Sequence, residues 1–153
     1  MKPRIALLVF LLVVPAVAGA EKEKKSSPRL VEISSADQGD KKYLLKIVEL
    51  ERNAKTSKFK VTQQKRPSAV GGSMFVMRGF YEVAKARGTE YFTNLKEWAE
   101  KDGARIYIGG FTNQKNADIR AEFGKQFSPT NDAGQRRTFM SVSQCDLLWG
   151  KKE

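Results

Sequence analysis

Two neighbouring stretches early in the chain show the apolar and polar pattern of β-strands, and together they predict a hairpin. The stretch 41–51 (KKYLLKIVELE) is compact and apolar and contains β-branched residues. In 58–63 (KFKVTQ), Phe59 and Val61 fall on one side of an extended chain and lysines fall on the other. Successive side chains of a strand point to opposite faces, so 58–63 fits a strand with one face in water. The turn-forming residues between the two stretches allow them to pair.

The next apolar residues recur at helical spacing and predict the longest helix of the chain, over 74–87 (MFVMRGFYEVAKAR). One face of this helix carries the apolar residues Val76, Phe80 and Val83. Ser73 is the expected N-cap, and Gly88 is the residue expected to end the last turn. Gly79 lies inside the helix, where glycine is less favourable than alanine by about 1 kcal/mol. We therefore expect Gly79 to mark close packing against a neighbouring element.

The stretch 89–113 (TEYFTNLKEWAEKDGARIYIGGFTN) fits two different structures. Its first apolar residues recur at helical spacing, which would indicate a second long helix. Against that, the pair Asp102-Gly103 between two aromatic-rich runs is a strong hairpin signal. We favour two strands, over 89–98 and 104–111.

The last part of the chain predicts one more helix and one more strand. The stretch 117–127 (ADIRAEFGKQF) is typical of a short helix, which we expect Asn116 to cap. Residues 137–149 are expected to form a last strand that ends at Trp149. The predicted fold class is therefore α+β, with a mainly antiparallel sheet of about five strands packed against one long helix and one short helix.

Part of this pattern resembles a group of small, uncharacterised bacterial exported envelope domains. The resemblance rests on "FKV", then the long helix "MRGFYEVAKARG", then the strand-like "TEYFTNL", and it covers residues 58–98. Members of the group run strand, helix, a glycine-ended last turn and an aromatic strand containing Tyr-Phe. The resemblance implies export and an α+β core. The group has no established chemistry, so no site residue follows from it.

The N-terminus has the three-part pattern of a secretory signal peptide over residues 1–20. Lys2 and Arg4 precede the apolar run 5–14, and Ala18-Gly19-Ala20 supplies small residues for cleavage. The apolar run is shorter than the roughly 20 residues that a membrane-spanning helix needs, so no membrane span is expected in the mature chain. No cysteine follows the small residues, which argues against lipidation.

We therefore expect a periplasmic or extracellular protein that is exported and not lipidated. Residues 21–40 are expected to be a flexible basic leading segment. Residues 41–150 are expected to form a single α+β domain, because 133 mature residues suffice for one core but not for two.

The charge of the chain favours anionic partners. Its 28 basic and 17 acidic residues give a formal net charge of +11, and removal of residues 1–20 leaves +9. Such an excess favours contact with phosphorylated or acidic molecules. The basic residues are dispersed, so no dedicated nucleic-acid motif is visible. Cys145, the single cysteine, cannot form a disulfide within the chain, and we expect it to be a small buried apolar residue.

The absence of histidine excludes most familiar catalytic devices. Ser-His-Asp and Cys-His catalysis, HExxH metalloproteases and histidine-based ribonuclease chemistry are all excluded. The chain also lacks the ligands of a tetrahedral zinc site. We therefore expect no catalytic residue, no metal site and no cofactor.

Two kinds of catalysis stay compatible with the composition. Paired carboxylates can act as acid and base in glycoside hydrolysis, and the candidates here are Glu97, Glu100 and Asp102. A Ser-Lys pair could act as a nucleophile and base, although Ser57-Lys58 lies in predicted turn material. Asp118 and Glu122 lie four residues apart and could bind calcium, although no third acid lies near them.

The strongest binding candidate is the segment "KRPSAVGGS" before the long helix. It contains Lys65, Arg66, Gly71, Gly72 and Ser73. A glycine pair before a helix can present several backbone N–H groups, and the helix dipole favours an anion there. The alternative is that Gly71 and Gly72 only let the chain turn into the helix. A second candidate is a groove for sugars or a peptide, lined by some of Tyr81, Tyr91, Phe92, Trp98, Tyr107, Phe111 and Trp149.

These observations predict a small exported protein that acts by binding, without catalysis of its own. The expected partner is an anionic envelope component or a periplasmic protein. One alternative is a small hydrolase that uses carboxylates or a Ser-Lys pair. Another is an interaction module that adds a strand to an exposed sheet edge, which requires a long edge strand free of proline and charge.

Overall fold

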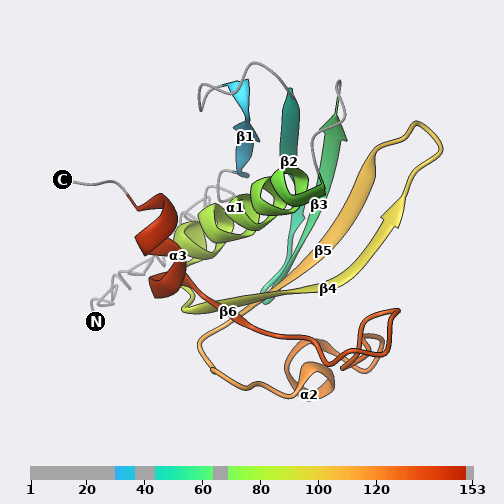
Figure 1. Ribbon diagram of the computed structural model, residues 1–153. Helices are drawn as coiled ribbons and strands as arrows, with labels where there is room; N and C mark the ends of the chain where they lie inside the picture. Colours follow the sequence, from blue (N-terminus) through green and yellow to red (C-terminus); the bar gives the residue numbers. More distant parts are fainter. Residues whose placement is uncertain (1–29, 37–43, 64–68, 151–153) are drawn as a thin grey trace, which may run out of the picture.

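The computed structural model describes residues 30–36, 44–63 and 69–150 of the chain (Figure 1). These residues form an α+β fold with one antiparallel sheet and three helices. The strands are β1 (Glu32–Ser34), β2 (Leu45–Arg52), β3 (Thr56–Gln63), β4 (Tyr91–Ala99), β5 (Arg105–Thr112) and β6 (Met140–Ser141). The helices are α1 (Ala69–Arg87), α2 (Ile119–Phe123) and α3 (Val142–Trp149). The strand order in the sheet is β1-β2-β3-β5-β4-β6.

The predicted fold class is confirmed, and the numbers of elements differ. The described residues contain six strands and three helices, against the expected five strands and two helices. The sheet is strongly curled: α1 lies across one face with α3 beside it, and the β4–β5 hairpin swings away from α1 (Figure 1).

The main core lies between α1 and the sheet and is built from aromatic rings. Phe80 of α1 packs on Phe59 of β3 with 4.9 Å between ring centroids, and on Phe111 of β5 with 6.4 Å. Phe92 of β4 meets Phe80 edge to face at 6.3 Å. All four rings are buried, so residues from four elements share one cluster.

A second, smaller core lies on the opposite face of the same sheet. Leu95, Ile119 and Phe123 are buried there, and Phe127 and Phe139 pack against them. Figure 1 shows the segment that contains α2 lying on the side of the sheet away from α1. The segment between β5 and β6 therefore covers a second face of the sheet.

Both predicted hairpins are confirmed. β2 and β3 pair directly, and the amide of Asn53 donates to the carbonyl of Thr56 at 2.8 Å in their turn. β4 and β5 also pair, with Gly103 at φ +81° in the connection. The strand predicted over 89–98 is therefore confirmed as β4, which spans Tyr91–Ala99, and the helical alternative is wrong.

The predicted long helix is confirmed, together with its end and its glycine. Gly88 follows α1 with φ +66°, a left-handed conformation that glycine adopts readily. Gly79 is packed against β2, because a Cβ added there would lie 2.5 Å from Cδ1 of Ile47. The expected start is wrong, however: α1 begins at Ala69, so Ser73 is a helical residue and not the N-cap.

The prediction for 137–149 is wrong over most of its length. Met140 and Ser141 pair with β4, but the following eight residues form helix α3. The side chains of Val142, Cys145 and Trp149 pack against the main core, and their spacing of three and four residues is helical. Cys145 is fully buried, as expected.

Two smaller expectations also need correction. Asp118, and not Asn116, caps α2: its carboxylate accepts a hydrogen bond from the amide of Ala121 at 2.8 Å. β1 lies within the segment 21–40 that was expected to be flexible, and it pairs with β2. The sheet therefore begins before residue 41. Residues 1–20, the expected signal peptide, lie outside the described residues.

Candidate functional site

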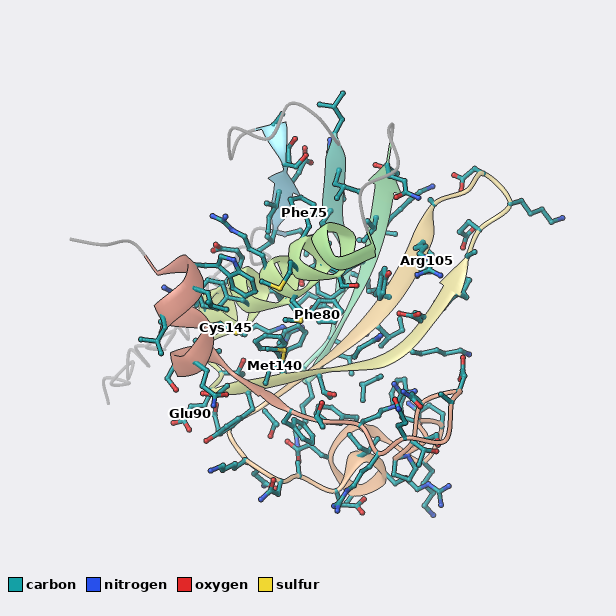
Figure 2. All side chains as sticks on the ribbon, viewed as in Figure 1. Phe75, Phe80, Glu90, Arg105, Met140 and Cys145 are labelled. Atoms are coloured by element: carbon teal, nitrogen blue, oxygen red, sulfur yellow. The ribbon has the colours of Figure 1, made fainter. Side chains whose placement is uncertain are left out.

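The curl of the sheet leaves a cavity of about 640 Å³ beside α1, which we call the concave cavity. Its walls are mostly apolar and come from α1 and five strands, β2 to β6. The apolar lining includes Val61, Val76, Met77, Phe80, Phe92 and Met140. Figure 2 shows Phe80 and Met140 below α1, and Arg105 on the hairpin that curls away from the helix.

Polar groups gather where the β4–β5 hairpin forms the far wall of the concave cavity. Asn94, Glu97, Arg105 and Tyr107 all line it. The amide nitrogen of Asn94 donates to Oε2 of Glu97 at 3.1 Å, and Nη1 of Arg105 lies 3.9 Å from Oε1 of Glu97. The amide oxygen of Asn94 is buried and has no hydrogen-bond partner among the described residues. Because Asn94 also lines the concave cavity, a rotation of its side chain that exposes this acceptor would let a ligand donate a hydrogen bond to it.

Tyr107 contributes a buried phenol side chain to this wall. Burial raises the pKa of Tyr107, and the hydrogen bond with Arg105 opposes that rise only in part. The same hydrogen bond raises the pKa of Arg105. Tyr107 is therefore a neutral phenol at physiological pH, beside a permanently charged guanidinium.

The described residues of the predicted anion site do not lie in a loop before the long helix. Gly72 and Ser73 line the concave cavity from the first turns of α1, and Gly71 is exposed next to them. All three lie inside the helix, so the expected glycine loop before its N-terminus is wrong. Lys65 and Arg66 lie outside the described residues.

The carboxylates considered for catalysis are engaged separately on the β4–β5 hairpin. Asp102 forms an ion pair with Lys60 at 2.8 Å, and Glu100 accepts a hydrogen bond from the indole of Trp98 at 3.1 Å. Of the three, Glu97 alone lines the concave cavity. Acid–base catalysis by two carboxyl groups facing each other has no counterpart in the described part of the cavity.

Asp118 and Glu122 are likewise engaged apart from each other. Asp118 caps α2, whereas Glu122 accepts from Thr112 at 2.7 Å and pairs with Lys55 at 2.9 Å. Within the described ranges, no group of three or more potential ligands among aspartate, glutamate and cysteine could hold a metal ion.

Ser57 and Lys60 have the spacing of a Ser-x-x-Lys pair, but a strand places them on opposite faces. Ser57 is buried and donates to Oε1 of Glu49 at 2.5 Å, while Lys60 reaches outward to Asp102. Because an odd spacing on a strand separates side chains, this pair cannot act as nucleophile and base.

A second cavity of about 700 Å³, which we call the basic hollow, lies where the residues before α2 meet the start of α3. Lys115, Arg136 and Arg137 line it, and Asp118 is the acidic residue of its described lining. Sequence reasoning missed this site because its basic residues lie about 20 positions apart.

Arg137 is held in place by main-chain groups. Its Nη1 donates to the carbonyl of Asn94 at 2.7 Å, and its Nε donates to the carbonyl of Ser128 at 3.0 Å. Burial lowers the pKa of Arg137, and the charges of Asp132 and Glu97 oppose that change. The described residues place no carboxylate in an ion pair with Arg137.

The described sheet edges are short or charged. β1 and β6, at the two edges, have three and two residues. β6 covers only Tyr91 and Phe92 of β4, and the part of β4 beyond it carries Lys96 and Glu97. Charged edges oppose pairing with another strand, so the described edges do not favour strand addition.

Comparisons with protein-family models, with curated proteins and with solved structures find no match to this chain. None of the helices in the described ranges is long and apolar enough to cross a membrane.

Proposed function

We propose that this chain is an exported, non-catalytic binding protein that holds a small amphipathic ligand in the concave cavity. The observation that carries this proposal is the combination of an apolar cavity with one buried acceptor, the amide oxygen of Asn94, that no described residue satisfies. Ligand cavities are typically concave, mostly apolar and supplied with a few polar groups that orient the ligand.

The apolar part of the ligand is placed by the lining of the cavity. Val76 and Met77 of α1 line the cavity, and so do the buried rings of Phe80 and Phe92. Each square ångström of apolar surface removed from water contributes about 25 cal/mol. A hydrocarbon chain or a flat apolar ring system would gain most from such walls.

The polar end of the ligand is selected by Asn94. A buried acceptor without a partner destabilises a complex by about 1–3 kcal/mol, so a ligand that donates a hydrogen bond is preferred over one that cannot. Glu97 and Arg105 add one charge of each sign beside Asn94. This neutral total favours an uncharged or zwitterionic head over a strongly anionic one.

Binding without catalysis fits the chemistry of the lining. Glu97 is the single carboxylate in the described lining, and the chain contains no histidine.

The proposal of export rests on the signal-like pattern of residues 1–20. Sequencing the N-terminus of the protein from its native host tests export, because processing predicts a mature chain that starts at Glu21.

Cavity filling tests the binding proposal. In Val76→Trp the larger side chain occupies the cavity, and we expect it to abolish the fluorescence gain of an apolar probe such as anilinonaphthalene sulfonate. Met74→Trp is the matched control, since Met74 is exposed on the same helix and does not line the cavity. Equal probe binding by the two variants, with unchanged thermal unfolding, would contradict the proposal.

The role of Asn94 has a separate test. We expect 1-decanol to displace the probe about fivefold better than decyl methyl ether, because only the alcohol donates a hydrogen bond. In Asn94→Ala this preference should disappear while the affinity for the ether is retained. An equal preference in both proteins would show that Asn94 does not select the ligand.

A further inference from the structure

Among the described residues, no acidic side chain forms an ion pair with the cations of the basic hollow. The seven ion pairs of the described residues include no cation from the stretch 113–139. In contrast, Lys46, Lys55 and Lys60 each pair with an acid. The charge of Lys115, Arg136 and Arg137 is thus available to a partner from outside the chain.

Arg137 gives the hollow a fixed point. Its two hydrogen bonds to carbonyls of Asn94 and Ser128 anchor the guanidinium to the edge of β4 and to the loop that follows α2. Arg137 is also only partly exposed, which weakens the screening of its charge by water. A cation that is anchored in advance loses little conformational freedom when an anion binds.

The opposite wall of the hollow is the start of α3. Ser141, Ser143 and Gln144 line the hollow from this first turn. The side chain of Ser141 makes no capping bond, and its Oγ lies 2.6 Å from Oγ of Ser143. A bond between two hydroxyls uses one of their two hydrogens, so the second stays available to donate to an acceptor. The positive end of the helix dipole adds to the attraction for an anion.

We propose that the basic hollow binds a phosphate monoester. Three cations and the one carboxylate of Asp118 leave the described lining with a charge of +2. A phosphate monoester carries close to two negative charges at neutral pH and three acceptor oxygens. Arginine matches phosphate geometry with paired N–H groups, which makes Arg136 and Arg137 the main contacts. This site is separate in its chemistry from the concave cavity and does not depend on the proposed function.

Calorimetric titration of the purified full chain with glycerol 3-phosphate tests the proposal. We expect binding that weakens at high salt, and binding about tenfold weaker in the double variant Lys115→Ser, Arg136→Ser. Both residues are exposed, so the fold should be retained. The matched control is Arg120→Ser, Lys125→Ser, which removes the same charge from exposed positions of the same segment that do not line the hollow. If both double variants lose the same affinity for glycerol 3-phosphate, the anion is attracted only by the general positive charge of the protein. That result would overturn the proposal.

The position of the anion has its own measurement. In ¹⁵N–¹H spectra, glycerol 3-phosphate should shift the amides of Ser143 and Gln144 at the start of α3. Shifts confined to other parts of the chain would overturn the proposal. A third experiment measures binding to vesicles that contain phosphatidic acid. If the protein binds the vesicles and not the free ester, the phosphate belongs to a lipid head group. If it binds the free ester, the ligand is soluble. Binding to neither would refute the site.

Discussion

The buried carboxylate of Glu49 ties together the strands at one end of the sheet. It accepts hydrogen bonds from the amide of Val31 at 3.0 Å, from Nε of Arg52 at 2.8 Å and from Oγ of Ser57 at 2.5 Å. Arg87 of α1 donates to the same Ser57 at 2.6 Å. Because the donors to the Glu49 carboxylate all come from the protein itself, we interpret this carboxylate as a structural group and not as part of a ligand site.

Glu49→Gln should destabilise the domain by about 3 kcal/mol at neutral pH, because it leaves the cation of Arg52 buried without its partner. Burial alone would raise the pKa of Glu49, but hydrogen bonds from Arg52, Ser57 and Val31 outweigh burial, and the pKa is lowered from 4.5. The stabilisation is therefore present above the unfolded pKa and is lost as pH falls through the folded one.

Urea unfolding of the parent and of Glu49→Gln from pH 7 to pH 3 measures this effect. The difference in the free energy of unfolding between the two proteins should shrink as pH falls below about 4.5. Only the parent has a titratable carboxyl group at position 49. Glu51→Gln is the control, since Glu51 is exposed on the same strand and should change stability little. A difference that stays constant over this range would contradict the assignment.

At the scale of elements, the approach of α1 to β2 depends on Gly79. A Cβ at this position would lie 2.5 Å from Cδ1 and 3.3 Å from Cγ2 of Ile47. Ile47 is buried beneath the helix, so its methyl groups have little room to move. The gain of about 1 kcal/mol in helix propensity from alanine is therefore smaller than the cost of overpacking, which is about 1–3 kcal/mol.

Gly79→Ala should accordingly lower the free energy of unfolding by about 1 kcal/mol. Ile47→Val deletes Cδ1, and in that background Gly79→Ala should become neutral or stabilising. Denaturant unfolding of the four proteins of this double-mutant cycle measures the coupling between the two positions. An identical effect of Gly79→Ala in both backgrounds would show that the contact with Ile47 does not limit the helix.

At the scale of the whole molecule, the described residues form one sheet with a core on each face, and the two cores differ in size. Thirteen buried residues form the core beneath α1 and α3, whereas three form the core beneath the segment that contains α2. Gly109 and Gly110 of β5 let rings approach the sheet from both sides, since an added Cβ would lie 2.9 Å from Phe59 or from Phe123. We therefore expect the smaller core to open locally without unfolding the sheet.

Phe123→Ala should speed amide hydrogen exchange in α2 and in the flanking loops, while amides of α1 and β3 keep their protection. Phe75→Ala is the matched control, because Phe75 is as buried as Phe123, at 8% exposed, but belongs to the main core. It should speed exchange throughout the domain, since that core supports most of the sheet. Exchange mass spectrometry of both variants distinguishes these patterns, and uniform acceleration by Phe123→Ala would contradict two separable cores.

Expectations based on local pattern agree best with the structure. The alternation in 58–63, the turn at Gly103, the end of α1 at Gly88 and the packing of Gly79 all follow from residues close together in sequence. The final helix was missed for a related reason. The stretch 137–149 is short and rich in apolar residues, so strand and helix patterns compete there, and packing on the main core favours the helix.

The sequence by itself determined the α+β class, the two hairpins and the long helix, because hydrophobic period and turn residues act over a few positions. Only the tertiary structure decided where a ligand can bind. The curl of the β4–β5 hairpin opens the concave cavity beside the buried oxygen of Asn94, and the return of the chain after α2 brings Arg136 and Arg137 to Lys115. Such sites depend on the distance between side chains far apart along the chain, and that distance is set by how the sheet curls and packs.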